Sequence, residues 1–296
     1  MRTRARHSLR SMPARVAAST PARVDAVPPP SSRARVLDCE LDRVTMADAL
    51  DRVAHAIDSR TYCQHVAINA AKLVALHHDA GLRELVNRCE LVTADGQAVL
   101  WASRMLGDPV PARVTGIDLM HALFRRAEER GWRVYVLGAR HEVLSAALQA
   151  IRRQHPGLRI VGWRDGYFRP VEDRAVAESI GATGAQLLFV AISSPRKEHF
   201  LCTYGRATGT HFAMGVGGAI DIVAGQRRRA PVLWQELGLE WLFRLLQEPH
   251  RLFRRYTTTN LRFVVLVLHE LAARHGVLGG GARALPHRPG DARTRG

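Results

Sequence analysis

Lysine, cysteine and long apolar runs are all scarce in this sequence of 296 residues. Lys72 and Lys197 are its only lysines among 43 basic residues, a bias that a GC-rich codon supply produces without selection for function. No apolar run exceeds six residues, as at 263–268, whereas a helix needs roughly 18 to span a bilayer. The sequence therefore predicts no transmembrane helix.

The four cysteines exclude a disulfide scaffold, because Cys39, Cys63, Cys89 and Cys202 are few and widely spaced. No CxxC pair occurs, and no histidine stands at zinc-site spacing from a cysteine, so no metal site is expected. The hydrophobic fraction of 47% and the charged fraction of 24% are ordinary for a globular protein with a buried core.

The net charge of +16 lies mostly at the two ends of the chain. Residues 1–37 carry +7 and residues 272–296 carry +4, which leaves +5 for the 234 residues between them. Both ends are rich in arginine, proline and small residues, so we expect disordered tails at 1–37 and 272–296. This distribution argues against the alternative function, a basic nucleic-acid-binding α/β protein, which needs its cations on one folded face.

Between the tails, short apolar runs alternate with amphipathic stretches, which is typical of βαβ units. The expected strands are 65–69, 91–94, 132–137, 159–162, 186–192 and 210–216. The expected helices are 46–57, 70–78, 97–106, 117–130, 142–153, 171–180 and one that opens at Pro195. We predict an α/β domain over 38–229, a Rossmann-like and mostly parallel sheet with helices on both faces.

The pattern changes at Ala230, where aromatic and leucine residues crowd a segment that also holds several arginines. We predict an amphipathic helical appendage over 230–271, divided in two at Pro249. Arg244, Arg251 and Arg254 share a face if the chain is helical across them. Two interpretations remain open. These arginines bind a ligand, or they are solvent-exposed residues of two helices that only pack against the core.

Ligands of open parallel sheets bind beyond the carboxyl ends of the strands. The residues at those ends are small or polar, as a nucleotide or sugar-phosphate pocket requires. They are Asn69, Asp95-Gly96, Gly138, 193–198 and 215–221. Gly215-Val216-Gly217-Gly218 lacks the full G-x-G-x-x-G spacing, so an NAD-type oxidoreductase is not indicated. Asp95 is either the N-cap of the helix at 97–106 or a general base, and spacing alone leaves both open.

Nine short motifs appear in a characteristic order. They are TADGQ (93–97), WASRMLG (101–107), RVTGIDL (113–119), VLGA (136–139), GYF (166–168), SPRKE (194–198), GVGGAID (215–221), AP (230–231) and GLEW (238–241). As an ordered series over residues 40–265, they resemble the WecG/TagA/CpsF glycosyltransferases.

This resemblance implies an inverting transferase at the cytoplasmic face of the cell membrane, without a metal or other cofactor. Its partners would be a UDP-sugar donor of the N-acetylmannosamine type or a related hexose, and a polyprenyl-diphosphate-linked sugar as acceptor. The product would serve cell-surface polysaccharide synthesis. No nucleic-acid partner is expected, and homo-oligomerisation is left open.

The resemblance also assigns roles to single residues. Asp95 would be the catalytic base and Arg113 would stabilise phosphate. Asn69 and Asp221 would belong to the donor pocket. Together with Gly96, Gly138, Lys197, Gly217 and Gly218, which their positions at the strand ends select, they would form the nucleotide-sugar pocket. Arg244, Arg251 and Arg254 would reach the acceptor diphosphate at the membrane surface. The chain departs from the family at Lys197, where a glutamine is usual, and at Ala67, where well-known members have threonine. An ammonium in place of an amide changes both the charge and the hydrogen bonding of the donor pocket.

Overall fold

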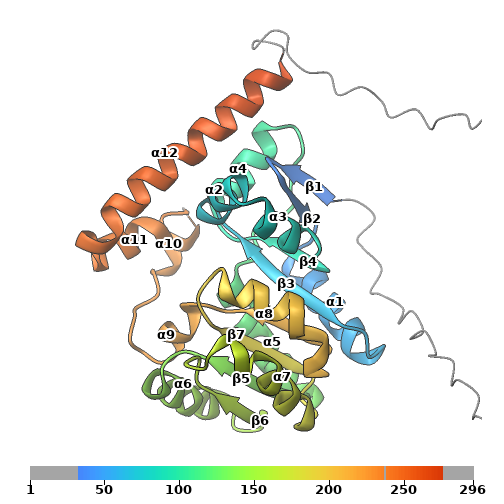
Figure 1. Ribbon diagram of the computed structural model, residues 1–296. Coiled ribbons are helices and arrows are strands. Elements are labelled where there is room, and N and C mark those ends of the chain that lie inside the picture. Colours follow the sequence, from blue (N-terminus) through green and yellow to red (C-terminus); the bar gives the residue numbers. More distant parts are fainter. Residues whose placement is uncertain (1–32, 237, 276–296) are drawn as a thin grey trace, which may run out of the picture.

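The computed structural model describes residues 33–236 and 238–275 of the chain. Its centre is a six-stranded parallel sheet in the order β4-β3-β8-β7-β5-β6 (Figure 1). The strands are β3 (Cys63–Ile68), β4 (Leu91–Ala94), β5 (Arg133–Gly138), β6 (Arg159–Arg164), β7 (Leu187–Ala191) and β8 (Phe212–Gly215). The α/β fold class predicted from the sequence is confirmed.

Helices cover both faces of the sheet. One face packs against α1 (Met46–Asp58), α5 (Gly116–Arg130), α6 (His141–Gln154) and α9 (Ala219–Val223). The other packs against α2 (Ala70–His78), α3 (Ala80–Asn87), α4 (Gln97–Met105), α7 (Asp173–Ala182) and α8 (Arg196–Tyr204). Two short 3-10 helices, Pro170–Glu172 and Gly205–Thr208, flank α7 and α8. Strand residues alternate between the two cores, as for Val134 and Tyr135 of β5, because neighbouring side chains of a strand point to opposite faces.

A hairpin precedes the sheet and corrects the expected extent of the N-terminal tail. Strand β1 (Arg33–Val36) begins inside the segment 1–37 that we expected to be disordered, and it pairs with β2 (Cys39–Asp42). The hairpin is held by the buried carboxylate of Asp42, which accepts hydrogen bonds from Arg33 Nε at 3.0 Å and from the backbone N–H of Val92 at 2.6 Å. Val92 belongs to β4, so the hairpin covers that edge of the sheet. Residues 1–32 and 276–296 of the two expected tails lie outside the described residues.

The C-terminal segment is helical and contacts the half of the sheet that contains β3 and β4. It consists of α10 (Val232–Glu236), α11 (Glu240–Gln247) and α12 (Pro249–Arg274), which runs across α2 (Figure 1). Phe263 and Val267 of α12 are buried against the core residues of α2 and α4. Arg274 Nη1 donates to the carbonyl oxygen of Leu106 at 2.5 Å. Among the described helices, none combines the length and apolar character needed to cross a membrane.

Candidate active site

The carboxyl ends of β5 and β7 form a crevice at the point where the chain connections diverge. The crossover from β5 leads to its neighbour β6, and the crossover from β7 leads the opposite way to β8. Gly138, at the end of β5, has φ of +121°, and a Cβ there would lie 2.5 Å from the carbonyl carbon of Ala191. A side chain cannot be accommodated at this position, so Gly138 allows the last paired residues of β5 and β7 to approach closely.

A cavity of about 700 Å³ opens beyond these strand ends. Its lining includes Gly217, Gly218 and Asp221 after β8, Ser193 after β7 and Ala139 after β5. The volume falls within the roughly 300–1,000 Å³ range of small-ligand pockets. The structure thus brings three of the sequence-predicted pocket residues into one cavity, and the predicted Gly138 immediately precedes a fourth lining residue.

Tyr167 stands at this cavity and was not singled out as a site residue from the sequence. Its ring is largely exposed, although large apolar rings are usually covered. Arg140 Nε donates a hydrogen bond to the Tyr167 hydroxyl at 3.2 Å, and Arg140 lines the same cavity. The GYF motif at 166–168 contains this tyrosine and was the signal that could have identified it.

Asp95 follows β4 directly, and its backbone N–H donates to the carbonyl oxygen of Ile68 at 2.7 Å. The N-cap of α4 is Gly96, and no side chain caps that helix, so the helix-cap interpretation of Asp95 is wrong. Burial raises the pKa of the Asp95 carboxyl to about 6, because the charged form is poorly solvated there. Arg244 and Arg113 act in the opposite direction on this pKa, whereas Glu240 and Asp118 add to the rise.

Gly238, just before α11, contacts the start of α4, two residues after Asp95. Gly238 has φ of +73°, and a Cβ there would lie 2.5 Å from Cβ of Gln97, the first residue of α4. The start of α11 therefore lies against the segment that carries Asp95 and Gly96. This contact explains why Arg244 and Glu240, both on α11, are among the charges that act on Asp95.

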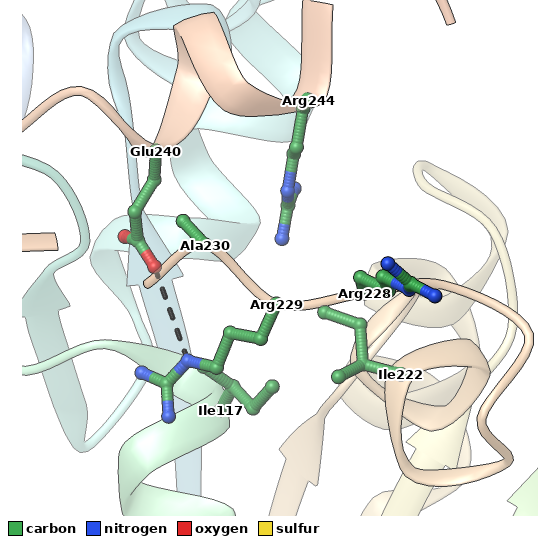
Figure 2. A pocket seen from close by; sticks show the side chains of 7 residues that line it. All are labelled: Ile117, Ile222, Arg228, Arg229, Ala230, Glu240 and Arg244. Carbon is green, nitrogen blue, oxygen red and sulfur yellow. Dashed lines mark ion pairs between the residues drawn. The ribbon is translucent and has the colours of Figure 1, made fainter. Parts of the chain in front are cut away.

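Ion pairs join Arg113 and Asp118 to residues far along the chain. Arg113 Nη1 lies 3.0 Å from Glu240 Oε2, and Arg229 Nη2 lies 2.6 Å from Asp118 Oδ1. Arg229 and Glu240 also line a small cavity with Arg228 and Arg244, of about 10 Å³ (Figure 2). Sequence reasoning assigned no site role to Asp118, Arg229 or Glu240. The RVTGID and GLEW motifs contain two of them, and the third belongs to a run of three arginines at 227–229.

A buried hydrogen-bond chain supports the loop that carries Arg113. Thr93 Oγ1 donates to the carbonyl oxygen of Val114 at 3.0 Å and lies 2.9 Å from His65 Nε2. Burial lowers the pKa of His65 to about 3, so its imidazole is neutral and donates from Nε2 to Thr93. The chain ties β3 and β4 to the residue after Arg113.

Lys197 lies in a compact ionic cluster rather than among the residues of the large cavity. Its Nζ is 2.8 Å from Glu198 Oε1, and the same oxygen is 2.6 Å from Lys72 Nζ. Burial opposes ionisation of Glu198, but the two ammonium groups outweigh it and lower its pKa to about 2. Gly215 leaves room for the Lys197 stem, since a Cβ there would lie 2.5 Å from Lys197 Cε.

Asn69 caps a helix, and the chain is not one continuous helix across Arg244, Arg251 and Arg254. Asn69 is exposed and caps α2, its Oδ1 accepting from the backbone N–H of Lys72 at 3.0 Å. Arg244 lies on α11, whereas Arg251 and Arg254 belong to α12, because the helix is interrupted at Glu248. The side chains of Arg251 and Arg254 lie outside the described residues. In the described ranges, no three His, Cys, Asp or Glu side chains are grouped to hold a metal ion.

A parallel sheet with a cavity of this size at its carboxyl edge places the chain in the Rossmann-like class of α/β folds. The model of the glycosyl transferase WecG/TagA/CpsF family matches residues 34–276, and the chain belongs to this family. It is therefore a glycosyltransferase of cell-surface polysaccharide synthesis.

Proposed function

We propose that this enzyme transfers a sugar from a UDP-sugar to a polyprenyl-diphosphate-linked sugar, with inversion at the anomeric carbon. The observation that carries the proposal is Asp95, a carboxylate with a raised pKa that is surrounded by Arg113, Arg244, Asp118 and Glu240. A base with a pKa near the working pH suits proton abstraction from a hydroxyl group. The sugar is of the N-acetylmannosamine type or a related hexose, as the family resemblance implies.

In the proposed step one C–O bond forms and another breaks. Asp95 takes the proton of the acceptor hydroxyl, whose oxygen attacks the anomeric carbon of the donor. The bond from that carbon to the UDP oxygen breaks, and its electron pair leaves with the diphosphate. Arg113 stabilises the negative charge that develops there, as cationic groups do in phosphate-leaving reactions.

The nucleotide occupies the 700 Å³ cavity in this proposal. Gly217 and Gly218 let the backbone approach the phosphates, and Asp221 holds the nucleoside by hydrogen bonds. The exposed ring of Tyr167 offers a face on which uracil stacks. Asn69 and Gly96 follow β3 and β4 at the same edge of the sheet and Gly138 ends β5, whereas Lys197 is held by Glu198 outside the cavity.

In this proposal the α/β domain over 38–229 binds the donor, and the appendage over 230–271 contacts the membrane. Apolar side chains of α12 are exposed at helical spacing, namely Leu261, Val264, Val265 and Leu268. They lie on a different side from the buried Phe263 and Val267, so α12 has a second apolar face. We propose that this face enters the cytoplasmic membrane surface, where Arg244, Arg251 and Arg254 bind the acceptor diphosphate.

The test of this function is turnover with defined substrates. The full-length protein is incubated with individual UDP-sugars and a short-chain polyprenyl-diphosphate-linked sugar, and released UDP and glycosylated lipid are quantified. We expect equimolar UDP and product with at least one UDP-hexosamine or UDP-hexose. Absence of turnover with every UDP-sugar, together with turnover of another nucleotide sugar, would contradict the assigned donor class.

The pH dependence of this reaction should report the Asp95 carboxyl. The base must be ionised to accept a proton, and its pKa is raised to about 6. We therefore expect kcat/KM to fall about tenfold per pH unit below that value and to level off above it. The measurement is kcat/KM for the donor between pH 4.5 and 8.5, at saturating acceptor. A rate that stays flat down to pH 4.5 would assign the base role to a group with an ordinary pKa.

A further inference from the structure

Glu240 places a carboxylate among arginines that come from three parts of the chain. It lies in the first turn of α11, and its Oε2 pairs with Arg113 Nη1 at 3.0 Å. Its Oε1 lies 4.0 Å from Arg229 Nε, in the loop that follows α9. Arg244, one turn further along α11, lines the same small cavity as Glu240 and Arg229 (Figure 2).

Arg229 carries a buried donor that its neighbours do not satisfy. Its Nη2 pairs with Asp118 at 2.6 Å, but its Nε is buried and has no hydrogen-bond partner in the described part of the chain. The Glu240 oxygen at 4.0 Å is beyond hydrogen-bond distance from it. A buried N–H without an acceptor is unfavourable, so this guanidinium is suited to an additional oxygen ligand.

The space between these groups is too small for a phosphate in the present arrangement. The cavity of about 10 Å³ is comparable to the roughly 10–15 Å³ that a single water needs. A carboxylate and a phosphate offer guanidinium groups the same chemistry, two or more oxygens that share negative charge. The Glu240 carboxylate therefore provides such an anion from the chain itself.

We propose that Arg229 is a further ligand of the substrate's diphosphate, and that Glu240 pairs with Arg113 and lies against Arg229 until this anion displaces it. The proposal rests on the proposed function, which places a diphosphate beside Arg113. The diphosphate of the donor and that of the lipid-linked acceptor share this chemistry, and the experiment below distinguishes between them.

The first experiment is calorimetric titration of the full chain with inorganic pyrophosphate. Glu240→Gln removes the internal anion but keeps the size of the side chain, so we expect Kd to fall about fivefold or more. Arg229→Gln removes a phosphate ligand, so we expect Kd to rise about tenfold. The ion pair between Asp51 and Arg126, at 2.9 Å on α1 and α5, offers matched controls. Asp51→Asn and Arg126→Gln should leave Kd within about twofold of the parent protein.

The second experiment repeats the titrations with UDP and with geranyl diphosphate, a short lipid diphosphate. The ligand whose Kd responds to both Glu240→Gln and Arg229→Gln identifies which diphosphate occupies the site. Thermal melting of each variant verifies that it is folded.

The outcomes separate this proposal from the proposed function. If the parent protein binds pyrophosphate and Glu240→Gln binds it no more tightly, only the displacement by Glu240 is overturned. If Arg229→Gln binds as tightly as the parent, Arg229 is not a ligand. If neither the parent nor Glu240→Gln binds pyrophosphate, UDP or geranyl diphosphate, both proposals fail.

Discussion

Asparagine at position 95 should lower kcat by about a hundredfold or more, because an amide cannot accept the proton of the acceptor hydroxyl. The fold and the affinity for UDP should be preserved, since Asp95 does not cap α4 and does not line the 700 Å³ cavity. The measurement is steady-state turnover together with UDP titration. Asp51→Asn serves as the matched control, because Asp51 is a carboxylate on α1 that pairs with Arg126 of α5.

Asp95→Asn should also melt at a slightly higher temperature than the parent at pH 7.5. The pKa of Asp95 is about 6 in the folded protein and 3.8 for a free carboxyl, so the folded state binds the proton more tightly. Protonation therefore stabilises the fold at low pH, and this contribution is lost as pH rises from about 4 to about 6. An amide has no such loss. Near-normal kcat in the variant would remove Asp95 from the chemistry.

Glutamine at position 244 should lower turnover with the lipid-linked acceptor by about tenfold to a hundredfold while UDP binding changes little. Arg244 lines the small arginine cavity and lowers the pKa of Asp95, so its loss should also move the acidic limb of the pH profile upward. A higher pKa in the acidic limb of the pH profile indicates loss of this charge, whereas displacement of α11 alone would not require it. The measurement is kcat/KM against pH with a water-soluble short-chain acceptor.

Arg262→Gln provides the control for Arg244→Gln, because Arg262 is an exposed arginine on α12 of the same appendage. It should retain turnover within about twofold. Full activity of Arg244→Gln with an unmoved pH profile would contradict a role for α11 at the site. Deleting residues 230–296 should likewise abolish transfer, but it also exposes the apolar surface on α2 and α4 that Phe263 and Val267 cover. The point substitution is therefore the sharper test.

The sequence predicted the elements whose pattern is local and missed those that depend on distant partners. The six parallel strands are short apolar runs, and all six occur close to their expected positions. The β1–β2 hairpin was missed because its strands have four residues each and carry charges. The hairpin is held by apolar side chains buried in the core and by Asp42, which is hydrogen-bonded to Arg33 and Val92, contacts that spacing along the chain does not reveal.

The same contrast holds for the candidate site. The rule that ligands bind at the carboxyl edge of a parallel sheet selected Gly217, Gly218 and Asp221, and the structure has these three residues lining one cavity. Arg229 and Glu240 were missed because their partners Asp118 and Arg113 lie more than a hundred residues away in sequence. Such ion pairs form only when α11 and the loop after α9 fold back onto the start of α5.

The connection between α9 and α10 has a consequence for how enzymes of this architecture diversify. One loop, residues 224–231, connects α9 to the three C-terminal helices, and in the proposed function those helices bind the lipid-linked acceptor at the membrane surface. Exchange of the segment after Ala230 between two such enzymes would therefore exchange acceptor preference without rebuilding the donor pocket. A chimaera of this kind must keep apolar residues at positions 263 and 267, because these side chains join the exchanged helices to the rest of the protein.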